Sequence, residues 1–272
     1  MIEWLGQVLG IGWKITPAGG LTGDAFVAEK DNRRLFLKRN SSPFLAVLSA
    51  EGIVPKLIWT KRMENGDVIT AQEWLEGRSL KAHEMQHQRV ADILHKIHHS
   101  SELLHMLLRM GRKPATSDDS LKNIKEMLNS RGLIANYVEV QTAIDHLEQL
   151  LPNTRNQNLV VCHCDINHNN LILTEDGNIF LVDWDNAMIA DPVTDFGMLL
   201  KWYIPIENWN DWLIKYGVTP NSNLFERMYW YLLHDALQFL NWHSKREEPV
   251  KVMERLNDLK ELNEQIRTSI LK

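Results

Sequence analysis

The amino-acid sequence predicts an α+β protein in which a β-rich N-terminal part precedes a mostly helical C-terminal part. Short apolar or alternating segments, separated by turn residues, fill roughly the first 75 residues. After Gly77 the apolar residues recur at helical spacing, apart from one strand–loop–strand segment at 159–182. A chain of 272 residues is long enough for two lobes with a core each. We therefore expect an N-terminal lobe over 1–75 and a C-terminal lobe over 76–272.

The N-terminal part is expected to contain three strands, a short helix and a hairpin. The three strands are expected at 9–16, 25–30 and 34–38, with turns at 17–20 and 31–32 between them. Residues 43–50 can form the short helix. The hairpin follows because the strand patterns at 57–60 and 68–74 flank the pair Asn65-Gly66, a strong signal for a tight turn.

The C-terminal part is expected to consist mainly of helices, because its apolar residues are spaced three and four apart. The helices are expected at 86–99, 103–110, 121–128, 137–151, 196–203, 208–216 and 224–243, with a last one from Pro249, a residue that suits a first helical turn. The last helix carries an apolar stripe made of Met253, Leu256, Leu259, Leu262, Ile266 and Ile270. We expect this stripe to pack on its own lobe, since it is too short and too irregular for a coiled-coil seam.

Composition and charge exclude several classes of protein. The net charge of −5 gives no basic surface for nucleic acid or anionic membranes, so no direct nucleic-acid binding is expected. No run of about 18 apolar residues offers a membrane span, and the first residues lack a basic secretory signal. Cys162 and Cys164 are too close in sequence for a disulfide framework. These features predict a cytoplasmic protein with reduced cysteines and no membrane contact.

Carboxylate and amide side chains are concentrated in the segment 162–185. Asp165 is followed five residues later by Asn170, and Asp183 comes after an expected hairpin. Transfer of a phosphoryl group to an alcohol needs one carboxylate that orients the hydroxyl and accepts its proton, and an Asn and an Asp that hold Mg²⁺ against the phosphates. The alternative is a loop that merely caps strands, because Asp and Asn favour turns. The complete spacing, flanked by apolar strands, favours phosphoryl transfer.

The segment 162–173 resembles the His-Gly-Asp-x-x-x-x-Asn signature of the aminoglycoside phosphotransferase and choline kinase family, whose fold is bilobal and protein kinase-like. The resemblance covers nearly the whole chain. It implies ATP and Mg²⁺ as cofactors and a small-molecule hydroxyl as the phosphate acceptor. It assigns the following roles: Asp165 as catalytic base, Asn170 and Asp183 as metal ligands, and Asp185 as a second ligand or orienting group. The chain departs from the signature at Cys164, which stands where the family has Gly.

The N-terminal part supplies candidate residues for the nucleotide. Gly19 and Gly20 lie in a turn where glycines would let backbone amides approach phosphates, although a plain hairpin turn would use the same residues. Lys38 stands on the strand where the resemblance places the lysine that neutralises the α- and β-phosphates. Glu51 is the candidate partner of Lys38, with an ordinary exposed glutamate as the alternative. At the hinge between the lobes, the backbone groups of Glu73 and Leu75 would meet the adenine.

Two further segments resemble the same family. Residues 90–98 resemble its helix that ends in Leu-His, and residues 191–196 resemble the segment after the metal-binding Asp. The resemblance implies that Asp195 braces the catalytic loop, which is a structural role.

Three strings narrow the resemblance to one subgroup. Residues 37–45, 71–75 and 181–185 look like the CcrZ subgroup of this family, which is found in Firmicutes and linked to cell-cycle control, and His168 also fits it. This resemblance implies a kinase that phosphorylates the 5′-hydroxyl of a nucleoside-like or ribosyl substrate. It also implies contact with a cell-division or replication-initiation protein.

Two alternatives to this kinase stay open. One is a regulatory binding module without turnover, against which the intact set of Lys38, Asp165, Asn170 and Asp183 argues. The other is aminoglycoside phosphorylation, which needs a densely acidic acceptor pocket. The helical part has scattered acids, namely Glu207, Asp211 and Asp235. Four of its tryptophans, Trp202, Trp209, Trp230 and Trp242, are expected to be mostly core, with one or two available to stack on a base or contact a cation.

Overall fold

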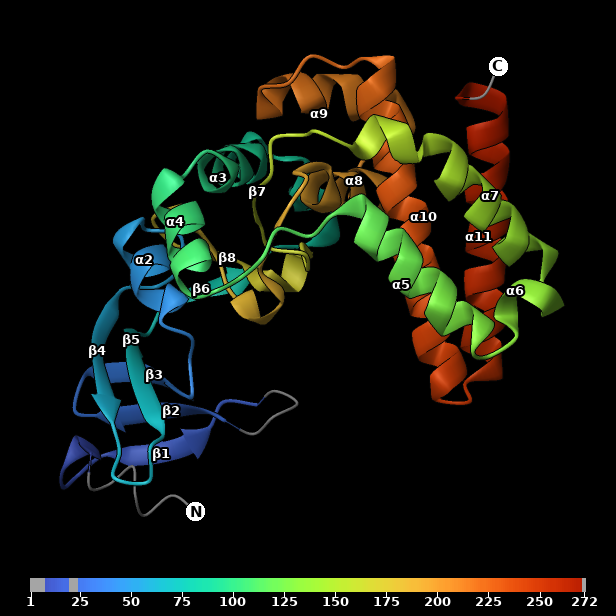
Figure 1. Cartoon of the computed structure of the whole chain (residues 1–272). Helices are drawn as coiled ribbons and strands as arrows, with labels where there is room; N and C mark the ends of the chain where they lie inside the picture. Colours follow the sequence, from blue (N-terminus) through green and yellow to red (C-terminus); the bar gives the residue numbers. More distant parts are fainter. Residues whose placement is uncertain (1–7, 20–23, 271–272) are drawn as a thin grey trace. The chain divides into compact units, whose positions relative to one another are not determined.

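The computed structural model describes residues 8–19 and 24–270, and its chain forms two compact units (Figure 1). The first unit contains Met1–Lys81 together with His168–Asp185, and the second contains Ala82–Asn167 together with Asn186–Lys272. Neither unit is therefore one continuous piece of chain. The segment 168–185, which falls within the expected C-terminal lobe, belongs to the unit that carries the N-terminal strands.

The first unit is built on a five-stranded antiparallel sheet with the order β1-β2-β3-β5-β4. Its strands are β1 (Lys14–Pro17), β2 (Ala25–Lys30), β3 (Arg33–Arg39), β4 (Leu57–Arg62) and β5 (Val68–Glu73). The expected strands are confirmed except that the first is much shorter than 9–16. Gly10 and Gly12 have φ angles of +82° and +93°, a left-handed backbone that interrupts an extended strand.

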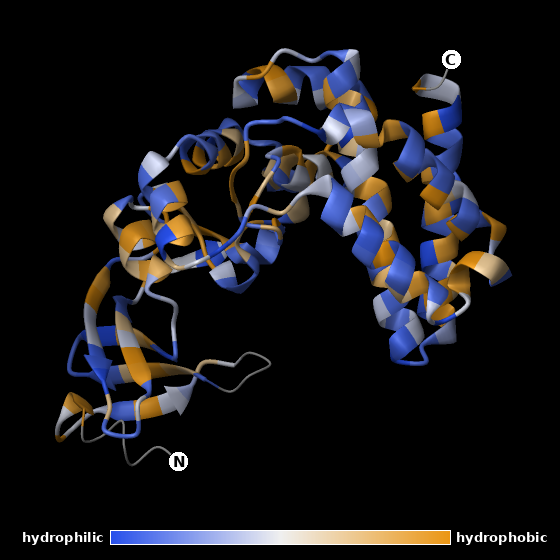
Figure 2. Ribbon diagram, in the orientation of Figure 1, coloured by the Kyte–Doolittle hydropathy of each residue, from blue (hydrophilic) through white to orange (hydrophobic). Residues whose placement is uncertain are grey.

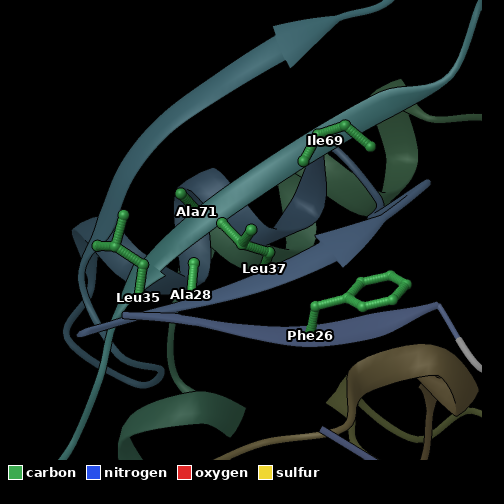
Figure 3. Packing of buried hydrophobic residues seen from close by; sticks show 6 residues of the cluster. All are labelled: Phe26, Ala28, Leu35, Leu37, Ile69 and Ala71. Carbon is green, nitrogen blue, oxygen red and sulfur yellow. The ribbon is translucent and has the colours of Figure 1, made fainter. Parts of the chain in front are cut away.

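One face of this sheet carries the core of the unit (Figure 3). The cluster consists of Phe26, Ala28, Leu35, Leu37, Ile69 and Ala71, all buried. Two members come from each of β2, β3 and β5, always two positions apart. Alternate residues of a strand point to the same face, so the pattern of each strand predicts which residues are buried.

A helix and a small second sheet complete the first unit. The helix α2 (Phe44–Ala50) confirms the one expected at 43–50 and buries Phe44 and Leu48. The second sheet has the order β6-β8-β9, with β6 (Gly77–Ser79), β8 (Leu171–Thr174) and β9 (Ile179–Leu181). Gly77 is required there, because a Cβ atom would lie 2.6 Å from the carbonyl oxygen of Leu173. Three residues are too few to show a strand pattern, so β6 is absent from the sequence-based expectation.

The second unit is mostly helical. Its helices are α3 (Gln88–His98), α4 (Ser101–Arg109), α5 (Ser117–Asn129), α6 (Leu133–Asn136), α7 (Val138–Leu150), α8 (Val193–Tyr203), α9 (Trp209–Tyr216), α10 (Ser222–Lys245) and α11 (Pro249–Ser269). A two-stranded antiparallel sheet pairs β7 (Val160–Cys162) with β10 (Met188–Ala190). The short elements α6 and β10 add to the helices that the sequence predicts.

The long helix α10 lies at the centre of the helical packing, against α5, α7, α8 and α11. The stripe on α11 is confirmed for Leu256, Leu259, Leu262 and Ile266, which are buried within this unit. The expectation is wrong for Met253, whose side chain is 56% exposed, and Ile270 is half-buried just beyond the end of the helix. In Figure 2 hydrophilic and hydrophobic residues alternate along these helices, as expected for helices that bury one face. Within 8–19 and 24–270, no helix combines the length and apolar character that a membrane span requires.

Candidate active site

The expected catalytic loop begins where β7 ends, and Asp195 braces it. The backbone N–H of His163 donates to Oδ2 of Asp195 over 2.8 Å, and the N–H of Cys164 donates to Oδ1 over 2.7 Å. Asp195 is buried in the first turn of α8. The bracing role expected for Asp195 is thereby confirmed.

Asp195 is held in turn by a buried histidine. Nε2 of His98 lies 3.0 Å from Oδ2 of Asp195, and Nδ1 of His98 lies 2.6 Å from the hydroxyl of Tyr216. Burial by itself would raise the pKa of Asp195, but the hydrogen bonds and charges of His98 and His163 together outweigh it and lower that pKa. The loop therefore rests on an ionised carboxylate that joins α3, α8 and α9.

The residues around Asp195 include types that bind metals, but their hydrogen bonds and protonation do not suit a metal ion. His98, Cys162 and Asp195 place possible ligand atoms within 4.8 Å of one another. Both oxygens of Asp195 already accept backbone N–H groups, and burial raises the pKa of the Cys162 thiol well above its ordinary value. A metal would need the thiolate. We interpret the group as a hydrogen-bonded brace.

Asp165, the expected catalytic base, is oriented by its own loop. The side-chain amide of Asn167 donates to Oδ1 of Asp165 over 3.0 Å and to its backbone carbonyl over 3.2 Å. The backbone N–H of Asp165 donates to Nδ1 of His163 over 3.2 Å. Asp165 is half-buried. Asn167 thus holds Oδ1 of the Asp165 carboxylate in place on a side chain that is half-buried.

Two residues beside the expected chemistry hold a left-handed backbone. Cys164 has a φ of +62° and Asp183 a φ of +67°. Left-handed backbone costs an ordinary L-residue about 1–2 kcal/mol. The family signature has Gly at the position of Cys164, and glycine adopts this conformation without that cost. The departure from the signature therefore leaves the loop geometry in place.

The expected metal-binding residues all belong to the first unit. Asn170 ends a short helical turn, and its carbonyl accepts the N–H of Val182 over 2.9 Å, which ties the two segments together. The indole of Trp184 donates to the carbonyl of Leu181 over 2.7 Å. Nζ of Lys38 lies 3.1 Å from both carboxylate oxygens of Asp185. Two carboxylates and an amide oxygen are donors that suit Mg²⁺.

The other residues expected at the nucleotide are found at three places in the first unit. Gly19 has a φ of +86°, while Gly20 lies outside the described residues. Glu51 directly follows α2, with its N–H donating to the carbonyl of Val47, and its pairing with Lys38 stays a prediction. At the expected hinge, the N–H of Glu73 already donates to the carbonyl of Lys56 over 2.8 Å, and Leu75 follows two residues later.

One site feature had no signal in the sequence. Asp235 on α10 lies close enough to Asp165 for the two negative charges to interact, although 70 positions separate them (235 − 165). Of the four tryptophans named in the sequence analysis, Trp209 and Trp230 are buried, whereas Trp202 and Trp242 are 52% and 48% exposed. The expectation of mostly core tryptophans therefore holds for two of the four.

Comparison with known proteins identifies the family. Residues 15–231 match the family described as "Phosphotransferase enzyme family". This match covers most of the chain, including every expected site residue.

Solved structures show the same fold. Choline kinase LicA from Streptococcus pneumoniae is 17% identical, with a TM-score of 0.70 over 97% of each chain. A thermostable mutant of aminoglycoside phosphotransferase APH(4)-Ia is 15% identical, with a TM-score of 0.71 over 97% of this chain and 99% of that one. The AMP-bound spectinomycin phosphotransferase APH(9)-Ia is 13% identical, with a TM-score of 0.67 over 96% and 97%. These likenesses confirm the predicted α+β, protein kinase-like fold.

Proposed function

Because this chain belongs to the phosphotransferase enzyme family, we propose that it transfers the γ-phosphate of ATP to a hydroxyl group of a small molecule. The observation that carries the proposal is the braced loop that ends in Asp165. Two backbone N–H groups bound to the buried Asp195 fix the turn before Asp165, and Asn167 fixes its carboxylate. A base of this kind must be held in place, because a misplacement of about 1 Å can reduce the rate about a hundredfold.

In the proposed reaction the carboxylate of Asp165 orients the acceptor hydroxyl and takes its proton. The hydroxyl oxygen forms a bond to the γ-phosphorus while the bond from that phosphorus to the β,γ-bridging oxygen breaks, and ADP leaves. Asn170, Asp183 and Asp185 would hold Mg²⁺, which neutralises charge on the phosphates when it is bound. Lys38, which pairs with Asp185 in this structure, would neutralise the α- and β-phosphates. Solved structures with the same fold include complexes with AMP, with ADP and with GDP, which supports nucleotide use.

For the acceptor we propose a nucleoside-like or ribosyl substrate, phosphorylated on its 5′-hydroxyl. The motifs shared with the CcrZ subgroup support this choice, and the exposed rings of Trp202 and Trp242 are available for stacking on a base. Glu207 and Asp211 are exposed and form no buried acidic pocket with each other, so an aminoglycoside acceptor is less favoured. The same resemblance extends the proposal to a role in bacterial cell-cycle control, in the cytoplasm.

The alternative from another class is a catalytically weak regulatory scaffold that binds a division or replication-initiation protein. Its support is the subgroup resemblance alone. The donor set of Asn170, Asp183 and Asp185 and the braced Asp165 favour turnover, because a regulatory module has no need to retain them.

The deciding experiment measures Mg²⁺-dependent ADP release with ribonucleosides, deoxynucleosides, free sugars, choline and aminoglycosides, for the wild type and for Asp165→Asn. We expect turnover with one class of acceptor. In the variant, kcat should fall about 10²- to 10⁴-fold, the range for loss of a general base, with ATP affinity unchanged. If Asp165→Asn turns over as fast as the wild type, Asp165 is not the catalytic base. If the wild type binds ATP but releases no ADP with any acceptor, the regulatory scaffold is favoured.

A further inference from the structure

The five-stranded sheet of the first unit has a second face, opposite its core, and two cations of β3 lie on it. Leu35 and Leu37 belong to the core cluster (Figure 3). Successive residues of a strand point to opposite faces, so Arg34 and Lys38 share the other face. Lys38 pairs there with Asp185, in the segment that carries the expected metal ligands. Arg34 is four residues away along β3, which corresponds to about 13 Å of extended chain.

Arg34 lies beside the expected hinge. The first residues of β3 are opposite the last residues of β5, with Leu35 opposite Glu73. Cζ of Arg34 lies over the ring of Trp74, 4.6 Å from its centroid. Trp74 stands between Glu73 and Leu75, whose backbone groups are expected to meet the adenine. The strand β3 thus carries one cation at the expected phosphate end of the nucleotide site and another at the expected base end.

Two carboxylates hold the guanidinium of Arg34 over this ring. Nε of Arg34 donates to Oε1 of Glu29 over 2.7 Å, and Nη1 donates to Oε1 of Glu76 over 3.1 Å. Glu29 is directly opposite Arg34 on β2, whereas Glu76 follows the expected hinge. A planar guanidinium can bind carboxylates through its edge while its face stacks on an aromatic ring. Arg34 therefore connects β2 and β3 to the chain at 74–76.

The indole of Trp74 forms no hydrogen bond that would hold its ring instead. Its N–H is removed from water, and within residues 8–19 and 24–270 it has no hydrogen-bond acceptor. The preceding backbone N–H, that of Glu73, is held by the carbonyl of Lys56 over 2.8 Å. The expected hinge is thus tied to the sheet by backbone pairing before Trp74 and by the guanidinium of Arg34 at Trp74 itself.

We infer that Arg34 is a positioning residue of the nucleotide site, which holds Trp74 and, through it, the neighbouring hinge backbone where the base of a nucleotide binds. This inference rests on the proposed kinase function. A purely stabilising role explains the cluster less well, because the side chains of Arg34 and Glu76 are 42% and 70% exposed, and exposed ion pairs add little stability. The effect of Arg34 should therefore fall on the base and not on the phosphates, which are expected at the other end of β3.

The test compares two ligands, ADP and inorganic tripolyphosphate, which both present a phosphate chain although only ADP carries a base. Titration calorimetry with Mg²⁺ gives their dissociation constants without any acceptor substrate. The variants are Arg34→Ala, Arg34→Lys and Glu76→Gln. Arg33→Ala is the matched control, because Arg33 is also exposed and carries the same charge but points to the opposite face of β3. Melting temperatures verify that each variant folds, which we expect because these side chains are exposed.

With Arg34→Ala we expect the Kd of ADP to rise about three- to tenfold, because an exposed cation–π contact and exposed ion pairs are each weak. The Kd of tripolyphosphate should not change, and Arg33→Ala should affect neither ligand. Arg34→Lys keeps the charge without the planar fork, so it should recover only part of the ADP affinity. Glu76→Gln should show a smaller loss. During turnover of Arg34→Ala, KM for ATP should rise while kcat and the KM of the acceptor stay at wild-type values.

Three results would overturn the inference while the kinase function stands. Unchanged ADP affinity in Arg34→Ala would show that the cluster does not act on the nucleotide. Equal losses for ADP and tripolyphosphate would assign the effect to charge, and so would an equal loss of ADP affinity in Arg33→Ala. If the wild type binds neither ADP nor tripolyphosphate, the proposed function itself fails and the inference fails with it.

Discussion

At the scale of single residues, Cys164 stands where the family signature has glycine, and it adopts the left-handed backbone that glycine would adopt next to the expected base, Asp165. The two hydrogen bonds to Asp195 use the backbone N–H groups of His163 and Cys164, so the loop does not depend on the Cys164 side chain for its shape. Burial raises the pKa of the Cys164 thiol well above its ordinary value, with the charge of Asp195 as a second cause. The thiol is therefore neutral and inert at physiological pH. Cys164 is a tolerated substitute for glycine and not a nucleophile.

This predicts opposite outcomes for two substitutions. Cys164→Gly removes the backbone strain but makes the unfolded chain more flexible, so we expect stability within about 1 kcal/mol of the wild type. Cys164→Val, of similar size, places a β-branched residue at a φ of +62° and should destabilise by about 2 kcal/mol more than the glycine variant. Urea unfolding measures both. Equal stabilities of the two variants would mean that the left-handed conformation does not limit this position.

The raised pKa of Asp235 also predicts how stability depends on pH. Its carboxyl titrates at about 7 in the folded protein, above the value near 4 expected for an unfolded Asp. The folded state therefore binds more protons between these pH values, and this group lowers stability as pH rises from about 4 to 7. Below pH 4 the effect vanishes, and above 7 it is complete.

Asp235→Asn removes this titration. The variant should equal the wild type in unfolding free energy at pH 4 and exceed it by an amount on the order of 1–3 kcal/mol at pH 8. The other groups that act on Asp235, namely Arg255 and Asp165, are present in both proteins, as is Cys164. Unfolding curves at the two pH values give the difference. A difference independent of pH would show that Asp235 has an ordinary pKa.

At the scale of elements, the brace beneath the catalytic loop joins helices that the sequence separates widely. His98 ends α3, Asp195 lies in the first turn of α8 and Tyr216 ends α9, and their side chains form one buried chain of hydrogen bonds. Removal of the central carboxylate takes the acceptor away from two backbone N–H groups and the partner away from Nε2 of His98. The expected consequence is loss of both stability and loop order.

We therefore predict that Asp195→Ala lowers the free energy of unfolding by about 3–5 kcal/mol, the range for removing one partner of a buried charged group. In protein that remains folded, kcat should fall more than the affinity for ATP. Asp118→Ala is the control, since its ion pair with Arg155 is exposed and screened by water, so its loss should cost far less stability. Chemical denaturation compares the two. Similar small losses in both variants would contradict a bracing role for Asp195.

Some of the elements and site residues can be predicted from the sequence alone, and others cannot. The strands at β2, β3 and β5 and the long helices follow from the alternation and spacing of apolar residues, and Asp165, Asn170 and Asp183 follow from their own spacing. The strands β6 and β10 have three residues each, too few for a pattern. The pairs Lys38–Asp185 and Asp165–Asp235 depend on tertiary packing across 147 and 70 positions, where local sequence carries no signal.

At the scale of the whole molecule, the most informative fact is that the chain passes between the two units three times. The hairpin β8–β9 comes from the middle of the sequence, yet it forms the small sheet with β6, and the N–H of Leu181 donates to the carbonyl of Ile53 over 2.9 Å. Trp184 packs edge-on against Phe44 of α2, with ring centroids 5.7 Å apart. The segment 168–185 is therefore part of the core of the first unit.

It follows that residues 1–81 should not fold well without this segment. Alone, they would leave β6 unpaired and expose the apolar surface that Leu171 and Leu181 cover, both of which are buried in the intact chain. We expect a fragment of 1–81 to show a broad, weakly cooperative thermal transition. The same fragment joined to 168–185 by a flexible Gly/Ser linker should melt cooperatively, because such a linker adds only a modest closure entropy. Circular dichroism during heating compares the two fragments, and equal melting temperatures would mean that the N-terminal strands and α2 form a sufficient core by themselves.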